Sequence, residues 1–168
     1  MRSRIMIIIL LCLSFAVTYG QNERSDREEL NLKLPVDGEQ YYEEKIESSL
    51  FFVKENLLQI YPGESILIEV ETEQKNITAM TVVKENLNPA KTLEVEFTQT
   101  VKDGKSEMMT LKVVNPFQSD LDYKAMMFLA GQEKGIMTSI LPVPANLTGY
   151  EMWPDVITTL ILFDWKFN

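Results

Sequence analysis

The sequence predicts an all-β protein, an antiparallel β-sandwich of about seven to eight strands that follows a cleaved signal peptide. Two observations support the sandwich. Apolar and polar residues alternate along several short segments, which is the period of a half-buried strand. Residues that favour turns, chiefly Gly, Pro, Asn and Asp, separate these segments. A third observation, a short apolar run behind two arginines at the amino terminus, predicts the signal peptide.

The first twenty residues have the composition of a secretory signal peptide. An apolar run over residues 5–13 follows the two arginines, and a small residue, Gly20, precedes the expected cleavage at Gln21. This run is too short to span a membrane, which takes about 20 apolar residues. The later run Val156–Phe163 is shorter still. We therefore predict an exported chain, periplasmic or extracellular, without a membrane span after cleavage.

The composition divides the chain into three parts. Residues 1–20 are the expected signal peptide, residues 21–45 a polar lead-in segment, and residues 46–168 a single β-sandwich domain. The lead-in is polar and charged without a sustained period, so we expect it to be flexible or loosely docked. Residues 41–54 fit either a short helix or the approach to a first strand, and periodicity does not decide between them.

The first strands of the domain follow a turn at Pro62 and Gly63. These two residues suit the centre of a type II turn, because glycine adopts the positive φ of its third position at little cost. Residues 65–72 alternate between apolar and polar, and residues 77–84 alternate as well. Residues 86–89 then interrupt the pattern. We predict two strands here, each with one face toward the core.

A hairpin is predicted around residues 103–104, an Asp-Gly pair. A two-residue loop at this pair would place apolar residues opposite polar ones on both faces. A three-residue loop instead pairs Phe97 with Met109 and Val95 with Leu111, which keeps one face apolar. Register follows the buried face, so the sequence favours the three-residue loop, with glycine at its left-handed position.

The carboxyl-terminal part contains three further predicted strands. Residues 121–129 are apolar on both faces, so we expect this strand to be central or covered by a second sheet or subunit. Residues 136–141 form a short apolar strand, and Pro142 and Pro144 are expected to stop any ladder. Residues 156–167 alternate to the end of the chain.

One fragment resembles strand F of immunoglobulin domains. In Ser119–Ala125, Tyr123 stands near the expected strand start, two residues before the position where antibody domains carry a cysteine. That position is Ala125 here, and the cysteine and tryptophan of the pattern are missing. The resemblance implies the fold alone, an immunoglobulin-like sandwich.

Charge and missing residue types exclude several classes of function. The chain has 25 acidic and 16 basic residues, a net charge of −9, which argues against nucleic acid or an anionic membrane as partner. It has no histidine, and its one cysteine, Cys12, lies in the expected leader. Histidine-dependent triads, thiol chemistry and ordinary zinc sites therefore lack their reagents. Glycine-rich phosphate loops are also missing, so we predict no cofactor and no metal.

Two aromatic residues are the candidate contacts with a ligand or partner. Tyr150 and Trp153 lie in a proline-containing connection before the last strand. Such side chains offer large contact areas with few rotatable bonds, so they stack on sugars or anchor a protein partner. The alternative for Trp153 is that it folds back and fills one end of the sandwich. Trp165 belongs to the terminal strand and is expected in the core.

These observations predict an exported, non-catalytic binding module of a bacterial cell envelope or secretome. Its partner would be a protein, a glycan or a second subunit, bound by loops or by an unpaired strand edge. Two alternatives remain. One is an eight-stranded outer-membrane β-barrel, whose strands span about 10 residues each. The other is a glycan-active enzyme with two carboxylates about 5 to 9.5 Å apart, although the sequence nominates no such pair.

Overall fold

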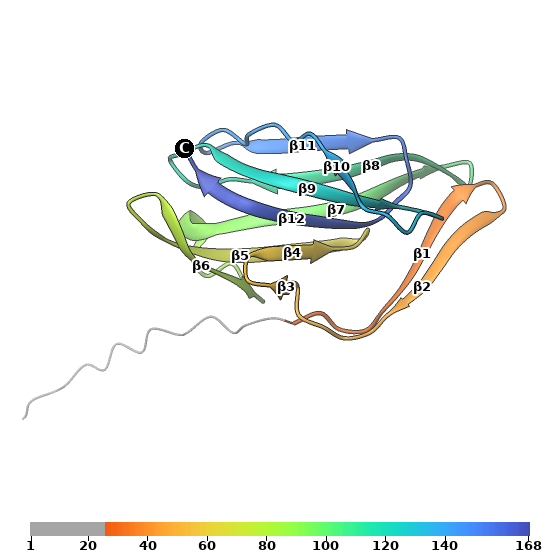
Figure 1. Ribbon diagram of the computed structural model, residues 1–168, viewed down its shortest axis with the longest axis horizontal. Coiled ribbons are helices and arrows are strands. Elements are labelled where there is room, and N and C mark those ends of the chain that lie inside the picture. The colour runs from red at the N-terminus through yellow and green to blue at the C-terminus, as the bar shows by residue number, and fades with distance from the viewer. Residues whose placement is uncertain (1–25) are drawn as a thin grey trace, which may run out of the picture.

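The structure, a computed structural model that describes residues 26–168, is all-β and confirms the predicted class. It contains two five-stranded sheets and a separate two-stranded hairpin (Figure 1). The β9 sheet has the strand order β10-β9-β12-β4-β3, and the β8 sheet has the order β11-β8-β7-β5-β6. The signal peptide predicted over residues 1–20 lies outside the described residues.

All strand pairs are antiparallel. The strands are β1 (Leu30–Asp37), β2 (Gln40–Ile46), β3 (Phe52–Lys54), β4 (Leu57–Ile60), β5 (Glu64–Glu73), β6 (Asn76–Val83), β7 (Thr92–Lys102), β8 (Lys105–Val114), β9 (Leu121–Leu129), β10 (Ile136–Thr138), β11 (Thr148–Trp153) and β12 (Ile157–Phe167), with one 3₁₀ turn at Pro89–Lys91. The described residues thus form more strands than the seven or eight predicted. Both five-stranded sheets are open, so the closed wall of the outer-membrane alternative does not form among these residues.

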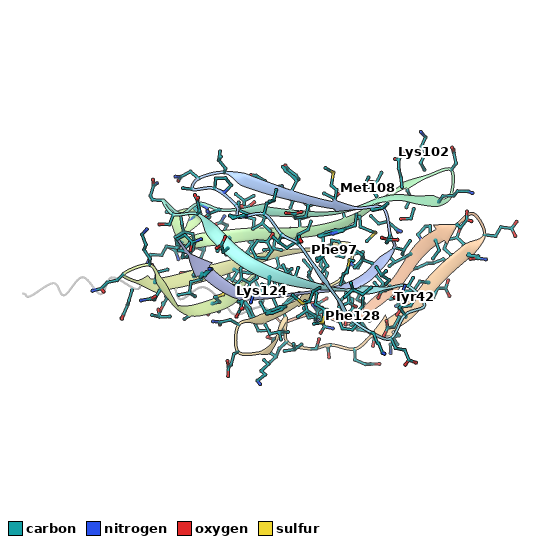
Figure 2. The ribbon with its side chains drawn as sticks, turned by 45° about the horizontal axis from the view of Figure 1, so that its top comes forward. Tyr42, Phe97, Lys102, Met108, Lys124 and Phe128 are labelled. Carbon is teal, nitrogen blue, oxygen red and sulfur yellow. The ribbon has the colours of Figure 1, made fainter. Side chains whose placement is uncertain are left out.

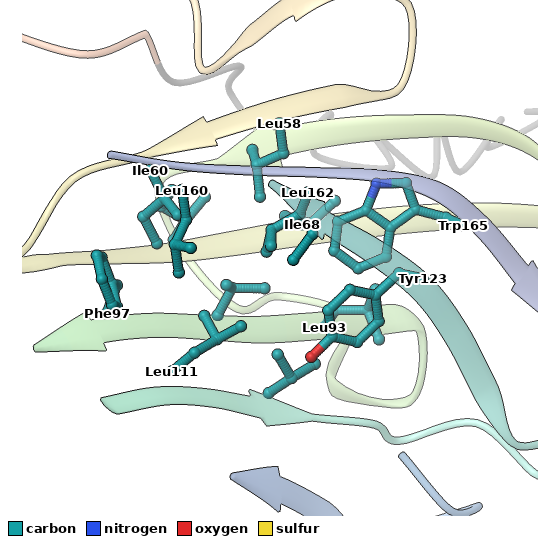
Figure 3. Packing of buried hydrophobic residues seen from close by; sticks show 14 of the residues in the cluster. Leu58, Ile60, Ile68, Leu93, Phe97, Leu111, Tyr123, Leu160, Leu162 and Trp165 are labelled. Carbon is teal, nitrogen blue, oxygen red and sulfur yellow. The ribbon is translucent and has the colours of Figure 1, made fainter. Parts of the chain in front are cut away.

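The core lies between the β8 and β9 sheets. Alternate side chains of each sheet point inward and exclude water, as the period of two requires (Figure 3). The largest side chains with no more than 2 % exposure are Phe97, Leu58, Ile60, Ile66, Ile68, Leu93, Met109, Leu111, Leu121, Ile157, Leu160 and Leu162. The rings of Tyr123 and Trp165 stack at one side of this core with centroids 4.9 Å apart.

The lead-in segment contains regular structure, where we expected a flexible or loosely docked chain. Strands β1 and β2 pair without a register shift from Leu30↔Ile46 to Pro35↔Tyr41. Leu32, Leu34 and Ile46 are buried against Tyr61, in a small core of their own. The leucines of β1 alternate with polar residues, and this alternation could have predicted the strand. It was overlooked because the segment as a whole is charged, chiefly on β2, where most residues are exposed to water.

The tip of this hairpin meets the tip of the β7–β8 hairpin. The side-chain amide of Gln99 donates to the carbonyl of Pro35 over 2.8 Å, and Lys105 forms an ion pair with Asp37 at 2.7 Å. Figure 2 shows Lys102 projecting from the same β7–β8 tip and Phe97 lying between the sheets. The amino-terminal hairpin is therefore docked on the sandwich by both apolar and polar contacts.

The predicted three-residue loop of the β7–β8 hairpin is wrong. The turn has two residues, Asp103 and Gly104, with φ of +50° and +75°, and both suit the left-handed conformation of such turns. A bulge at Glu107 then shifts the register by one residue. As a result Phe97 lies opposite Leu111, and the apolar face is preserved by a route that neither predicted loop contained.

The second apolar face of β9 is covered by the chain itself. We expected this strand to be central or covered by a second sheet or subunit, and it lies inside its sheet, between β10 and β12. The loop after β9 also passes so close that a Cβ atom at Gly135 would lie 2.4 Å from Met126 Sδ and 3.0 Å from Phe128 Cζ. A side chain at position 135 would require Met126 to move, so glycine lets the loop backbone lie directly against these partly buried side chains.

The prolines after β10 do not stop the ladder as predicted. Val143 stands between Pro142 and Pro144, and its N–H and C=O both bond to Leu121 at 2.9 Å. Alternate residues of a strand face the same neighbour, so neither proline has to donate to β9. Residues 136–143 therefore follow the edge of the β9 sheet beyond β10.

Three tyrosines predict how stability changes at alkaline pH. Burial is the main cause that raises the pKa of Tyr42 to about 12 and also raises the pKa values of Tyr61 and Tyr123. The folded state therefore holds these protons more tightly than the unfolded state, whose tyrosine pKa is about 10. The stability from this difference is complete below pH 10 and is lost as the pH rises toward 12.

The measurement is the free energy of unfolding in urea at pH 8 and pH 11. Tyr123→Phe removes one of the three groups. We therefore expect the free energy of unfolding to fall less between pH 8 and pH 11 in this variant than in the unmodified protein. Equal losses in both proteins would contradict the role of Tyr123.

Candidate functional site

The candidate site is the side of the sandwich where β10 and β11 lie. Each is an edge strand of its sheet, and residues 139–147 connect the two strands. The indole N–H of Trp153 on β11 donates to the hydroxyl of Thr138 on β10 over 3.0 Å, which ties the two edges together. We call residues 136–153 the β10–β11 margin.

Exposed apolar side chains are concentrated at this margin. It holds six of the eleven large apolar residues that are exposed in the described chain, and these are Ile136, Met137, Leu141, Leu147, Tyr150 and Met152. Leu141 is 75 % exposed and Met152 is 62 % exposed. Exposed apolar side chains that are grouped in one segment are candidates for contact with another molecule.

The margin is also nearly uncharged. Glu151 is its single charged residue, in a chain of which 24 % is charged. The Glu151 carboxylate accepts a hydrogen bond from the backbone N–H of Leu141 over 2.8 Å, so it is used to join β11 to the preceding segment. Apart from Glu151, the margin therefore carries no charged side chain.

The backbone of β11 presents unpaired groups at this surface. Asn115 N–H donates to the carbonyl of Leu147 over 2.9 Å, which makes this a hydrogen-bonded position of the ladder with β8. Positions alternate along an antiparallel pair. The residues whose N–H and C=O point away from β8 are therefore Thr148, Tyr150 and Met152.

The other edge strands of the two sheets are protected in ways that β11 is not. Strands β3 and β10 have three residues each. Strand β6 is interrupted by a register shift that leaves Thr78 without an opposite residue on β5. Short length and bulges are usual protections of an edge. Strand β11 pairs with β8 over six residues without a register shift.

The structure separates the two predicted contact residues. Tyr150 is 58 % exposed, whereas Trp153 is 8 % exposed and belongs to the core between the sheets. Both lie on strand β11, not on a loop as predicted. Trp153 in this position does not reach a surface ligand, and its place agrees with the alternative that it fills the sandwich. Tyr150 stays a candidate contact.

A buried asparagine that sequence reasoning passed over shapes the margin. Asn115 is 1 % exposed, and its side-chain N–H groups donate to the carbonyls of Ser119, Val143 and Pro144 over 2.9 to 3.2 Å. Its side-chain oxygen accepts from the N–H of Phe117. Its acceptors are distant in the sequence and come together only after folding, so local pattern does not mark this asparagine.

A hollow of about 520 Å³ is lined by residues of β9 and β12 and by Ile140 and Pro142. Its carboxylates are paired with lysines: Lys124 contacts Asp164 at 2.6 Å and Lys166 contacts Asp122 at 3.3 Å. Catalysis by two carboxylates needs one acid and one base, and both acids here are engaged by cations. We assign no chemistry to this hollow.

Within residues 26–168, no group of three or more His, Cys, Asp or Glu side chains could hold a metal ion. No helix in this range is long and apolar enough to cross a membrane.

Fold and site together define an all-β sandwich with one open, neutral and apolar edge. Comparisons with family models, with curated proteins and with solved structures found no match.

Proposed function

We propose that this protein is an exported, non-catalytic binding module that holds a partner protein at the β10–β11 margin. Its place of work would be the periplasm or the exterior of a bacterial cell, on the basis of the leader-like residues 1–20. The partner would add an extended segment to β11 and cover the exposed apolar side chains beside it.

The observation that carries this proposal is the combination found on β11. The outward N–H and C=O groups of Thr148, Tyr150 and Met152 give a template for another strand. The side chains of Tyr150 and Met152 are exposed next to that template. Main-chain bonds supply affinity in such complexes, and neighbouring side chains supply specificity.

The proposed absence of catalysis rests on the sequence. The chain has no histidine, and its cysteine lies in the expected leader. The immunoglobulin-like character of the sandwich is also part of the proposal. Its support is Tyr123, which lies near the start of β9 as the resemblance to strand F implies.

Photochemical cross-linking in the producing cells tests the proposal. Replacing Tyr150 by p-benzoylphenylalanine places the reactive group beside the open edge. We expect one discrete protein adduct after irradiation, because a bound strand would lie against this side chain. The matched control replaces Tyr41, a tyrosine of β2 that is 47 % exposed and lies outside the margin.

We expect no discrete adduct at position 41. Mass spectrometry then identifies the adduct at position 150 as a protein or a glycan. A glycan adduct, or equal labelling at both positions, would contradict the proposed protein partner.

A further inference from the structure

We infer that the strand bound by β11 is β11 of a second copy, so that two β8 sheets join into one continuous sheet around a two-fold axis at Tyr150. This inference rests on the proposed function, because it names the partner of the same edge. A two-fold axis is the usual symmetry of a homodimer, and each subunit then uses the same surface.

Backbone geometry allows this arrangement without rearrangement of the ladder with β8. With Tyr150 opposite Tyr150 of the second copy, Thr148 lies opposite Met152 of that copy. Thr148, Tyr150 and Met152 are the residues whose N–H and C=O point away from β8. Every outward group over Thr148–Met152 thus finds a partner, as in a hydrogen-bonded antiparallel pair.

The side chains of β11 match themselves in this register. On the outer face, the two Tyr150 rings meet at the axis, and each Met152 covers a Thr148, so the exposed apolar groups bury one another. On the inner face, Glu151 lies opposite Gly149. Gly149 has no side chain. Val143 occupies the space where one would lie, since a Cβ atom at Gly149 would be 2.7 Å from Val143 Cγ2.

One alternative register that keeps both faces is centred on Glu151. It would place the two Glu151 residues directly opposite each other, with Cβ atoms about 5 Å apart. Like charges in that position are destabilising. The register centred on Tyr150 separates the same carboxylates by two further residues along the strand, so a single glutamate selects between the two registers.

The charge of the chain favours a second copy at this margin and disfavours one elsewhere. With a net charge of −9, two copies repel each other in most orientations. The margin carries a single charged side chain, whose carboxylate already accepts the Leu141 N–H. Two copies can therefore approach edge to edge without bringing acidic faces together.

A cysteine scan tests both the partner and the register. The whole chain is expressed with Cys12→Ser, so that an introduced cysteine is the sole thiol. Tyr150→Cys puts the thiols on the axis, where Cα atoms of a hydrogen-bonded pair lie about 5.5 Å apart, within the range of a disulfide. Met152→Cys is the matched control, because Met152 of one copy lies opposite Thr148 of the other.

We expect the Cys12→Ser chain to sediment as a dimer. Tyr150→Cys should become a disulfide-linked dimer under mild oxidation, and Met152→Cys should not. Mixing Thr148→Cys with Met152→Cys should yield the mixed disulfide. The Tyr150 N–H points away from β8, so Tyr150→Pro removes a bond of the dimer and no bond of the ladder with β8. This variant should be a monomer that still folds and has a measurable melting temperature.

A monomer at all concentrations, with no disulfide from Tyr150→Cys, would overturn the inference. So would equal disulfide formation by Met152→Cys, because the register would then be wrong. Capture of a different protein at position 150, with the chain itself monomeric, would leave the proposed function intact and overturn only the second copy. Absence of both kinds of partner would overturn the two together.

Discussion

Arg27→Ala is expected to lower the free energy of unfolding by about 3–5 kcal/mol, because it leaves a partly buried carboxylate without its cation. The Arg27 guanidinium is 2 % exposed and contacts Glu64 through Nε at 2.6 Å and Nη2 at 3.1 Å. It also donates to the carbonyl of Gln59 over 2.6 Å. The ring centroids of Phe51 and Tyr61 lie 4.6 and 4.7 Å from Arg27 Cζ, so both rings form cation–π contacts with the guanidinium.

Urea unfolding followed by tryptophan fluorescence measures this effect. Lys45→Ala is the matched control, because Lys45 pairs with Glu29 at 2.8 Å while both side chains remain at least half exposed. An exposed pair of this kind contributes about 1 kcal/mol or less. If both substitutions lowered the free energy of unfolding by similar amounts, the burial of Arg27 would make no extra contribution to stability, and the prediction would be wrong. In Glu64→Gln the cost of Arg27→Ala should fall, since no unpaired carboxylate is left behind.

Phe97→Ala is expected to cost about 3–5 kcal/mol of unfolding free energy, the range for loss of a fully buried aromatic ring. Phe97 has no exposed surface and sits between the two sheets, opposite Leu111 on β8 (Figure 3). Its removal takes apolar contacts from the core and leaves a cavity between the sheets.

Val101→Ala on the same strand is the control for Phe97→Ala. Val101 is 44 % exposed, so its truncation should change the unfolding free energy by no more than about 0.5 kcal/mol. Phe97→Leu should cost less than Phe97→Ala, because more of the volume remains filled. A cost of Phe97→Ala below about 1 kcal/mol would contradict the placement of this ring in a packed core.

The strands that could be predicted from sequence are those in which local alternation and burial agree. Residues 65–72 and 77–84 correspond to β5 and β6, and residues 156–167 correspond to β12. In β5, Ile66, Ile68 and Val70 lie two apart and face the same core, so the period is visible without knowledge of the partner strand. Register shifts interrupt the period in β6 and β12, where the core-facing positions change along the strand although the strand itself is recognisable. The all-β class follows from these segments together.

The register of the β7–β8 hairpin could not be predicted from the local sequence pattern. Both loops considered for residues 103–104 assumed an unbroken ladder. The bulge at Glu107 lets a two-residue turn and an apolar face coexist. Nothing in the immediate neighbours of Glu107 distinguishes a bulged residue from a paired one, because a bulge is a relation between two strands.

The candidate site was predicted in part. Tyr150 was a candidate from its residue type, and it lies exposed beside an open edge. Trp153, three residues further on, points into the core, because side chains of one strand alternate between its faces and these two have opposite parity. That contrast was hidden once the prolines led us to interpret the segment as a loop.

The sequence by itself determined that this chain builds stacked antiparallel strands and that histidine and thiol chemistry lack their reagents in residues 26–168. Those conclusions need only the types of residue and their spacing. The tertiary structure decided that β11 is an edge, that its outward amides belong to Thr148, Tyr150 and Met152, and that six exposed apolar side chains gather beside them. An edge exists only relative to the order of strands in a sheet, and long-range pairing sets that order.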